Sequence, residues 1–282
     1  MVDGCHLAPC ENDPRFYPAR VLSAEFQPHR VDRISLEANV PFFSNADIPI
    51  AFETLAWVQT FLVDPNPSMK RSRDSGGESI CPFAKPVLQE NSLYMAFHHE
   101  VNGKSAELIE SIVLGYREPF KKSTPFHQGE RFKKALLVIF PEIPPAETGV
   151  LDIVHSNVKA QFVHDGLMVA QCHSRCDGRS VHRPALKVYT SPHPMMAIRY
   201  MALHDILFLG DNESWFTAYD QRFGSSFREP EKLEDYEKPL VDIYRRAKTR
   251  FVKLNRNLPR SFPPDLKPWR LSDRHDFRTF PY

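Results

Sequence analysis

The stretch TGVLDIVHSNVKAQFVHDGLMVAQCH, residues 148–173, decides the fold because it holds a helix and the strand that follows it. Its first part repeats apolar side chains at helical spacing: Leu151, Val154, Val158 and Phe162. Gly166 then stands where helices commonly end. The next residues, LMVAQCH, form a short apolar run typical of a buried strand. The stretch therefore predicts a helix that leads directly into a strand.

The same alternation occurs upstream. SLYMAFHHEV (92–101) and KKALLVIFPE (133–142) are typical of strands, and SAELIESIVLGYREPF (105–120) between them is typical of a helix. We expect this helix to bury Leu108, Ile112 and Tyr116. A β-α-β-α-β order indicates helices packed on a sheet, which is an α/β (or α+β) fold. The strands at 133–142 and 167–173 are expected to run parallel, because a helix connects them.

Further helices are expected on both sides of this core. The segment 45–64 carries an apolar stripe at helical spacing, and downstream the segments 195–209, 213–223 and 231–254 are also expected to be helices. With additional C-terminal helices but no clean linker, the predicted organisation is an N-terminal arm (1–43), a single α/β domain (44–256) and a Pro- and Arg-rich tail (257–282).

Composition excludes several classes of function. The 36 Lys and Arg balance 35 Asp and Glu, so no global attraction to nucleic acid or to a membrane surface is expected. No apolar run approaches the roughly 20 residues of a membrane span, and no signal peptide is seen, which predicts a cytoplasmic protein. The sequence contains no GxGxxG, Walker or HExxH motif.

Cysteine and histidine gather where the strand at 167–173 ends, and three explanations compete: a metal held by Cys and His, a haem iron held by one of them, or no chemistry. Strand alternation puts His173 on one face and Cys172 on the other, so these two neighbours are not expected to hold one ion. A structural zinc held by two pairs stays an alternative: Cys172 and Cys176 with Cys5 and Cys10.

Cys81 is a separate candidate. It precedes a proline in ESICPFAKP, which favours extended backbone at the cysteine and holds its sulfur at a stiff turn. Cys-Pro is a dipeptide associated with haem, although a small buried apolar side chain is the simpler interpretation.

Four segments together resemble a bacterial domain family without an assigned activity that recurs beside natural-product biosynthesis genes: CPFAKPVL (81–88), LLVIFPEIP (136–144), GLMVAQCH (166–173) and SPHPMMAIRYMALHDILFL (191–209). The resemblance covers about residues 55–210. That family is similar to small haem proteins that hydroxylate a nitrogen of a free amino acid, such as arginine N-hydroxylases. The chain departs from the pattern at CHSRC, where the family has a phenylalanine before the histidine and no second cysteine.

The resemblance implies a haem b site. His173 is then expected to be the axial iron ligand, with Cys81 as its rival, whereas Cys172 and Cys176 are not expected to be ligands. Three arginines are candidates for the haem propionates: Arg199, Arg183 and Arg179. Asp205 or Glu100 is expected to hold a cationic substrate.

The function that the resemblance implies is a haem-dependent monooxygenase, an oxidoreductase that N-hydroxylates a free amino acid such as L-arginine in natural-product biosynthesis. The alternative is a non-catalytic protein that binds a small ligand or assists a biosynthetic complex, since a fold alone does not fix a function. The expected partner is a small amino acid, and a homodimer is left open. Neither a nucleic acid nor a membrane is expected as a partner.

Overall fold

The computed structural model describes residues 17–18, 46–66, 79–90, 92–122, 133–181, 183–235 and 237–254. The chain divides into two compact units, one of residues 1–158 and 169–199 and one of residues 159–168 and 200–282. The single domain at 44–256 stays a prediction. Apart from Tyr17 and Pro18, the predicted arm lies outside the described residues, and so does the predicted tail.

The first unit holds most of a five-stranded sheet, whose order is β1-β2-β3-β5-β4. The strands are β1 (Tyr17–Pro18), β2 (Leu93–Phe97), β3 (Ala135–Ile139), β4 (Leu167–Cys172) and β5 (Met195–Tyr200). β2 and β3 are parallel, whereas β1 is antiparallel to β2 and β5 is antiparallel to β3. The sheet and its helices confirm the α/β class.

β4 runs antiparallel to its neighbour β5. The Met201 N–H, just after β5, donates a hydrogen bond to the carbonyl of Gly166, just before β4. β4 therefore runs in the same direction as β3, as predicted, but β5 lies between them. As a result the carboxyl ends of β2, β3 and β4 share one edge of the sheet, where α/β proteins commonly build their sites.

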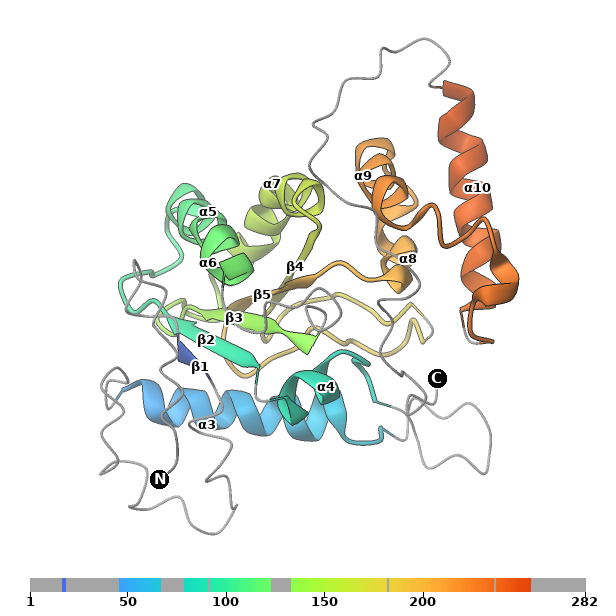
Figure 1. Cartoon of the computed structure of the whole chain (residues 1–282). Coiled ribbons are helices and arrows are strands. Elements are labelled where there is room, and N and C mark those ends of the chain that lie inside the picture. The colour runs from blue at the N-terminus through green and yellow to red at the C-terminus, as the bar shows by residue number, and fades with distance from the viewer. Residues whose placement is uncertain are drawn as a thin grey trace. The chain divides into compact units, whose positions relative to one another are not determined.

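Helices cover both faces of this sheet (Figure 1). On one face lie α3 (Asp47–Trp57), which continues as the π-helix η1 (Val58–Val63), and α4 (Ala84–Gln89). On the other lie α5 (Ala106–Gly115), α6 (Arg117–Lys122) and the first half of α7 (Val150–His164). The core on the α3 side is apolar: Ala51, Leu55, Val58, Val87, Leu93, Met95, Phe97, Leu137, Ile139, Cys172 and Met195.

The structure confirms the predicted set of buried apolar residues fully in α7 and only partly in α5. The α7 stripe is confirmed, since all four of its predicted residues are fully buried. In α5 the prediction is confirmed for Tyr116, which is buried, but not for Leu108, which is 45% exposed; the other buried positions are Ile109 and Val113. Both sets in α5 have helical spacing, so periodicity alone did not choose between them.

The helix predicted over 195–209 was wrong. Met195–Tyr200 is β5, paired with β3 from Ile139↔Met195 to Ala135↔Arg199, and only Ile206–Leu209 forms an α-helix, α8, after the 3₁₀ turn η4 (Leu203–Asp205). β5 is covered on both faces, so its continuous apolar run looked like a buried helix.

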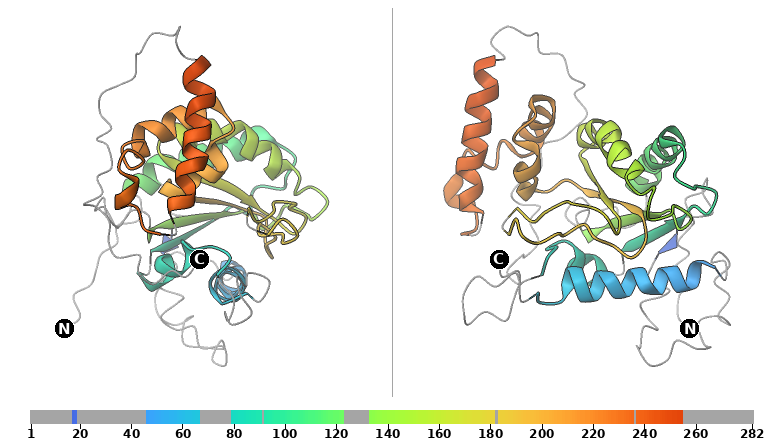
Figure 2. Two further views of the ribbon diagram at one scale, coloured as in Figure 1. Left: turned by 90° about the vertical axis from the view of Figure 1, so that its right-hand side faces the viewer. Right: turned by 180° about the vertical axis from the view of Figure 1, so that it is seen from behind.

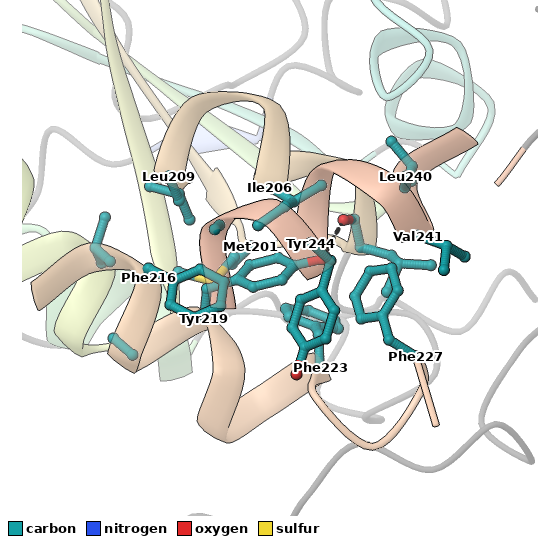
Figure 3. Close-up of a cluster of buried hydrophobic side chains, with 14 of the residues drawn as sticks. Met201, Ile206, Leu209, Phe216, Tyr219, Phe223, Phe227, Leu240, Val241 and Tyr244 are labelled. Atoms are coloured by element: carbon teal, nitrogen blue, oxygen red, sulfur yellow. Dashed lines mark hydrogen bonds between the residues drawn. The ribbon is translucent and has the colours of Figure 1, made fainter. Parts of the chain in front are cut away.

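The second unit is helical, with α8, α9 (Glu213–Phe223), the 3₁₀ turn η5 (Pro230–Lys232) and α10 (Lys238–Leu254). The bounds of α9 and α10 confirm the predicted helices at 213–223 and in 231–254. Figure 2 shows α10 beside α8 and α9. Aromatic side chains fill its core (Figure 3), where the rings of Phe227 and Tyr244 stack at 4.2 Å. The Tyr244 hydroxyl donates to Asp220, which also accepts from Lys248.

Within the described ranges, no helix combines the length and the apolar character that crossing a membrane requires.

Candidate metal centre

A tight turn follows β4 and fixes His173 and Cys176. The Cys176 N–H donates to the His173 carbonyl at 3.0 Å, which closes a four-residue turn. Strand alternation is confirmed here: Gln171 and His173 both reach Asp152 on α7, whereas Cys172 packs in the core on the α3 side. His173 therefore faces α7 at the carboxyl edge of the sheet.

Asp152, His173 and Cys176 form one group. Each offers a potential ligand atom, a carboxylate oxygen, an imidazole nitrogen and a thiol sulfur, and these atoms all lie within 4.8 Å of one another. His173 and Cys176 are each only 1% exposed, whereas the Asp152 side chain is 50% exposed. The group is thus buried on the side of the turn and open to solvent on the side of the helix.

One nitrogen in this group lacks a hydrogen-bond partner. The Nδ1 atom of His173 is buried and has none among the described residues. His98, the other fully buried histidine in this part of the chain, differs: its Nδ1 contacts Glu100 at 2.8 Å and its Nε2 contacts the Tyr116 hydroxyl at 2.9 Å. Burial is common to both histidines, so the unpartnered nitrogen is what distinguishes His173.

The spacing of the group suits an ion. His173 Nε2 lies 3.4 Å from Asp152 Oδ1, which is long for a hydrogen bond. Two ligands that each lie about 2.0–2.2 Å from a tetrahedral ion are separated from each other by a distance similar to the one between these two atoms. A set of oxygen, nitrogen and sulfur donors suits zinc or ferrous iron and disfavours magnesium and calcium.

Burial is the main cause of the raised pKa of two cysteine thiols, Cys172 and Cys176. It raises the pKa of the Cys176 thiol; the Gly178 backbone and Lys187 oppose this, whereas Asp152 and Asp177 add to it. Burial likewise raises the pKa of Cys172, far above its ordinary value. Each thiol is therefore protonated near neutral pH in the absence of a cation, and a metal at Cys176 would displace the proton.

The predicted arginines do not gather around His173. Arg199 lies on the opposite face of the sheet, where its guanidinium stacks on the Phe83 ring at 4.2 Å. Arg179 lies in the loop after the turn, 3.6 Å from Asp177, with Nη1 donating to the Pro184 carbonyl. The Arg183 N–H donates to Ser180 Oγ in the same loop.

The predicted rival ligand lies away from the group. Cys81 is half-buried at the start of the segment that leads into α4, and its N–H donates to the Leu62 carbonyl. The zinc alternative needs Cys5 and Cys10, which lie outside the described residues. Cys176 was expected not to be a ligand; its sulfur lies in the group, and the expectation stays a prediction.

The two acids predicted to hold a substrate have structural contacts. Glu100 accepts from His98, and Asp205 is fully buried and accepts the Ala202 N–H at 2.8 Å. Asp205 also belongs to the second unit. Sequence reasoning missed Asp152, because an acid in the first turn of a helix is already favoured there by the helix dipole.

Comparison with known proteins identifies a family for the region that contains this group. The profile of a family described as "Domain of unknown function (DUF6875)" matches residues 51–234. No curated protein matches the chain, and no solved structure does.

Proposed function

Since the chain belongs to the family of the domain of unknown function DUF6875, whose description states no activity, we propose a function from the site itself. The protein is a metal-dependent enzyme in which Asp152, His173 and Cys176 hold one transition-metal ion. Three protein ligands leave at least one position for a small molecule, as in catalytic rather than structural metal sites.

The observation that carries this proposal is that a buried imidazole, a carboxylate and a thiol offer ligand atoms within 4.8 Å of one another, while Nδ1 of the same imidazole, on His173, has no hydrogen-bond partner among the described residues. A buried polar atom without a partner costs about 1–3 kcal/mol. A cation bound by Nδ1 would offset that cost, and a rotation of the imidazole about its Cβ–Cγ bond would turn Nδ1 toward Asp152 in place of Nε2. Asp152 is half-exposed, so the group borders solvent on the side of α7.

We propose ferrous iron as the ion. We propose N-oxygenation of an amino acid such as L-arginine as the reaction, which is the reaction that the resemblance implies, although the resemblance implies haem b as the cofactor. Iron bound in this way supplies redox chemistry with dioxygen. His173 and Cys176 would hold the ion from its buried side, since both residues are only 1% exposed. Asp152 holds it from the solvent side and balances its charge.

A haem b at this position is the second candidate. The unpartnered nitrogen of His173 suits an axial ligand, which favours the haem. The remaining donors fit it less well, because a carboxylate and a thiol share the same few ångströms and Arg199 lies on the other face of the sheet. The donor set therefore fits a single ion better than a haem.

Metal titration of the purified, metal-free chain tests the site. Ferrous iron under anaerobic conditions, zinc and cobalt should each bind with one equivalent. His173→Gln and Cys176→Ser should each weaken binding by tenfold or more. The matched controls, His98→Gln and Cys172→Ser, change equally buried residues outside the group and should bind as the unchanged chain does. Equal binding by all five proteins would refute the site.

Mass spectrometry then tests the reaction. Iron-loaded protein with L-arginine, dioxygen and a reductant should give a product heavier by one oxygen atom, and His173→Gln should abolish it. A Soret band in protein grown with a haem precursor would instead favour the haem form. A chain that binds the metal but leaves arginine, lysine and ornithine unchanged would favour the non-catalytic alternative.

A further inference from the structure

Arg175 occupies a special place beside the proposed metal centre. It is a central residue of the turn whose ends are His173 and Cys176, and it is exposed. Its Nη1 donates to the carbonyl of Ala146 at 3.3 Å, in the loop that leads into α7. The guanidinium therefore reaches from the turn that holds His173 and Cys176 to the loop that leads into α7, the helix that carries Asp152.

The charge of Arg175 is not balanced by an acid. In the part of the chain that the structure describes, no carboxylate pairs with it, and its partner is a neutral carbonyl. Asp177, the acid next in sequence, lies 2.7 Å from Lys187 and 3.6 Å from Arg179. A guanidinium has five N–H donors in a planar fork, so Arg175 can hold an anion while it keeps the bond to Ala146.

The charge of the proposed metal centre also favours an anion at Arg175. A dication bound by one carboxylate and one thiolate is neutral, since metal ligands are deprotonated. The guanidinium of Arg175 then adds a positive charge that no ligand of the ion balances. A monoanion would cancel it, and a carboxylate matches the fork of the guanidinium with two parallel hydrogen bonds.

Resting on the proposed metal centre, we infer that Arg175 binds the carboxylate of a small substrate whose other end reaches the ion. The site thus selects small carboxylic acids, amino acids among them, over amines that lack a carboxylate. Arg179, which lies in the same loop but is paired with Asp177, does not take part.

Cobalt-loaded protein tests this, because the visible absorption of cobalt changes when a ligand binds near it. Acetate, glycine, inorganic phosphate and ethylamine are titrated into the unchanged chain and into Arg175→Gln, Arg175→Lys and Arg179→Gln. Acetate and glycine should bind about tenfold or more weakly to Arg175→Gln, which loses charged hydrogen bonds. Arg175→Lys should be intermediate because it keeps the charge without the fork, and Arg179→Gln should match the unchanged chain.

Equal affinity of Arg175→Gln and the unchanged chain for acetate would overturn the inference, and so would ethylamine binding as tightly as acetate. Phosphate binding much more tightly than acetate would replace the carboxylate with a phosphate as the recognised group and would also overturn it. Absence of a cobalt spectrum would refute the metal centre itself. Failure of the centre and failure of the inference are therefore distinguishable.

Discussion

His173 Nε2 and Asp152 Oδ1 lie 3.4 Å apart, although 21 positions separate the two residues in sequence. The helix that precedes a strand in a β-α-β unit runs back along the sheet, so the first turn of α7 lies over the carboxyl end of β4. This topology brings an acid from the start of the helix to a histidine at the end of the strand. The remaining ligand, Cys176, comes from the turn that follows.

Gln171 should position Asp152 for the metal. Its Nε2 donates to Asp152 Oδ1 at 2.9 Å, which fixes the carboxylate. Loss of such a bond to a ligand typically weakens metal binding about 10- to 100-fold. Gln171→Leu should therefore lower cobalt affinity by that factor, measured by titration. Gln161→Leu, a change on the exposed side of α7, should have no effect, and equal affinities in the two variants would rule out the positioning role.

His99 should make stability depend on pH. Its Nε2 contacts Asp47 at 2.7 Å and its Nδ1 contacts Glu142 at 3.1 Å. Partial burial lowers the pKa of His99, but the hydrogen bonds and charges of the two carboxylates outweigh it, so the pKa is raised. A raised pKa in the folded chain means that the stabilisation is complete below the unfolded pKa and is lost as pH rises through the folded pKa.

The change that tests this is His99→Gln, which keeps a polar side chain without the charge. Urea unfolding should show the unchanged chain to be more stable than the variant at pH 5, by about 0.5 kcal/mol for a partly exposed pair. The difference should shrink at pH 9. A difference that grows with pH would contradict the assignment.

Gly166 should not tolerate a side chain. Its φ is +76°, and a Cβ atom there would lie 2.5 Å from Nε of Arg222, whose Nη2 donates to the His164 carbonyl. Gly166→Ala should lower the free energy of unfolding by about 1–2 kcal/mol or more from the backbone alone. Gly115→Ala, in α5 with no atom within 4 Å of its added Cβ, should instead be neutral or stabilise by up to about 1 kcal/mol. Thermal unfolding distinguishes the two outcomes.

The sheet core should respond strongly to truncation. Ile139 at the end of β3 is fully buried, and Ile139→Ala should cost about 2–5 kcal/mol. Ile153 on α7 is 56% exposed, and Ile153→Ala should cost less than about 0.5 kcal/mol. Denaturant unfolding measures both. Similar costs for the two variants would mean that the β3 core is not packed as described.

Much of the fold was predictable because its periodic segments are clear. The α7 stripe and the strands β2, β3 and β4 follow from local apolar patterns, and the face of His173 follows from alternation within β4. β5 was missed because a strand covered on both faces has no alternation that would distinguish it from a buried helix. Because of that error, Asp205 and Arg199 were expected to lie in one helix.

The candidate site was only half predictable for a related reason. His173 stood out by type and place, but Asp152 joins it only through the return of α7 across the sheet, which is a property of topology. Cys176 joins the group through a turn that a hydrogen bond closes, and no sequence motif indicates that turn. Residues brought together by chain crossing and by irregular turns are not visible in local patterns.

X-ray absorption of the iron- or zinc-loaded chain tests the central claim most directly. We predict one sulfur neighbour at about 2.3 Å and nitrogen or oxygen neighbours at about 2.0–2.2 Å. The sulfur signal should vanish in Cys176→Ser and persist in Cys172→Ser. A shell without sulfur in the unchanged chain, or the four equivalent nitrogens of a porphyrin, would contradict a metal ion held by Asp152, His173 and Cys176.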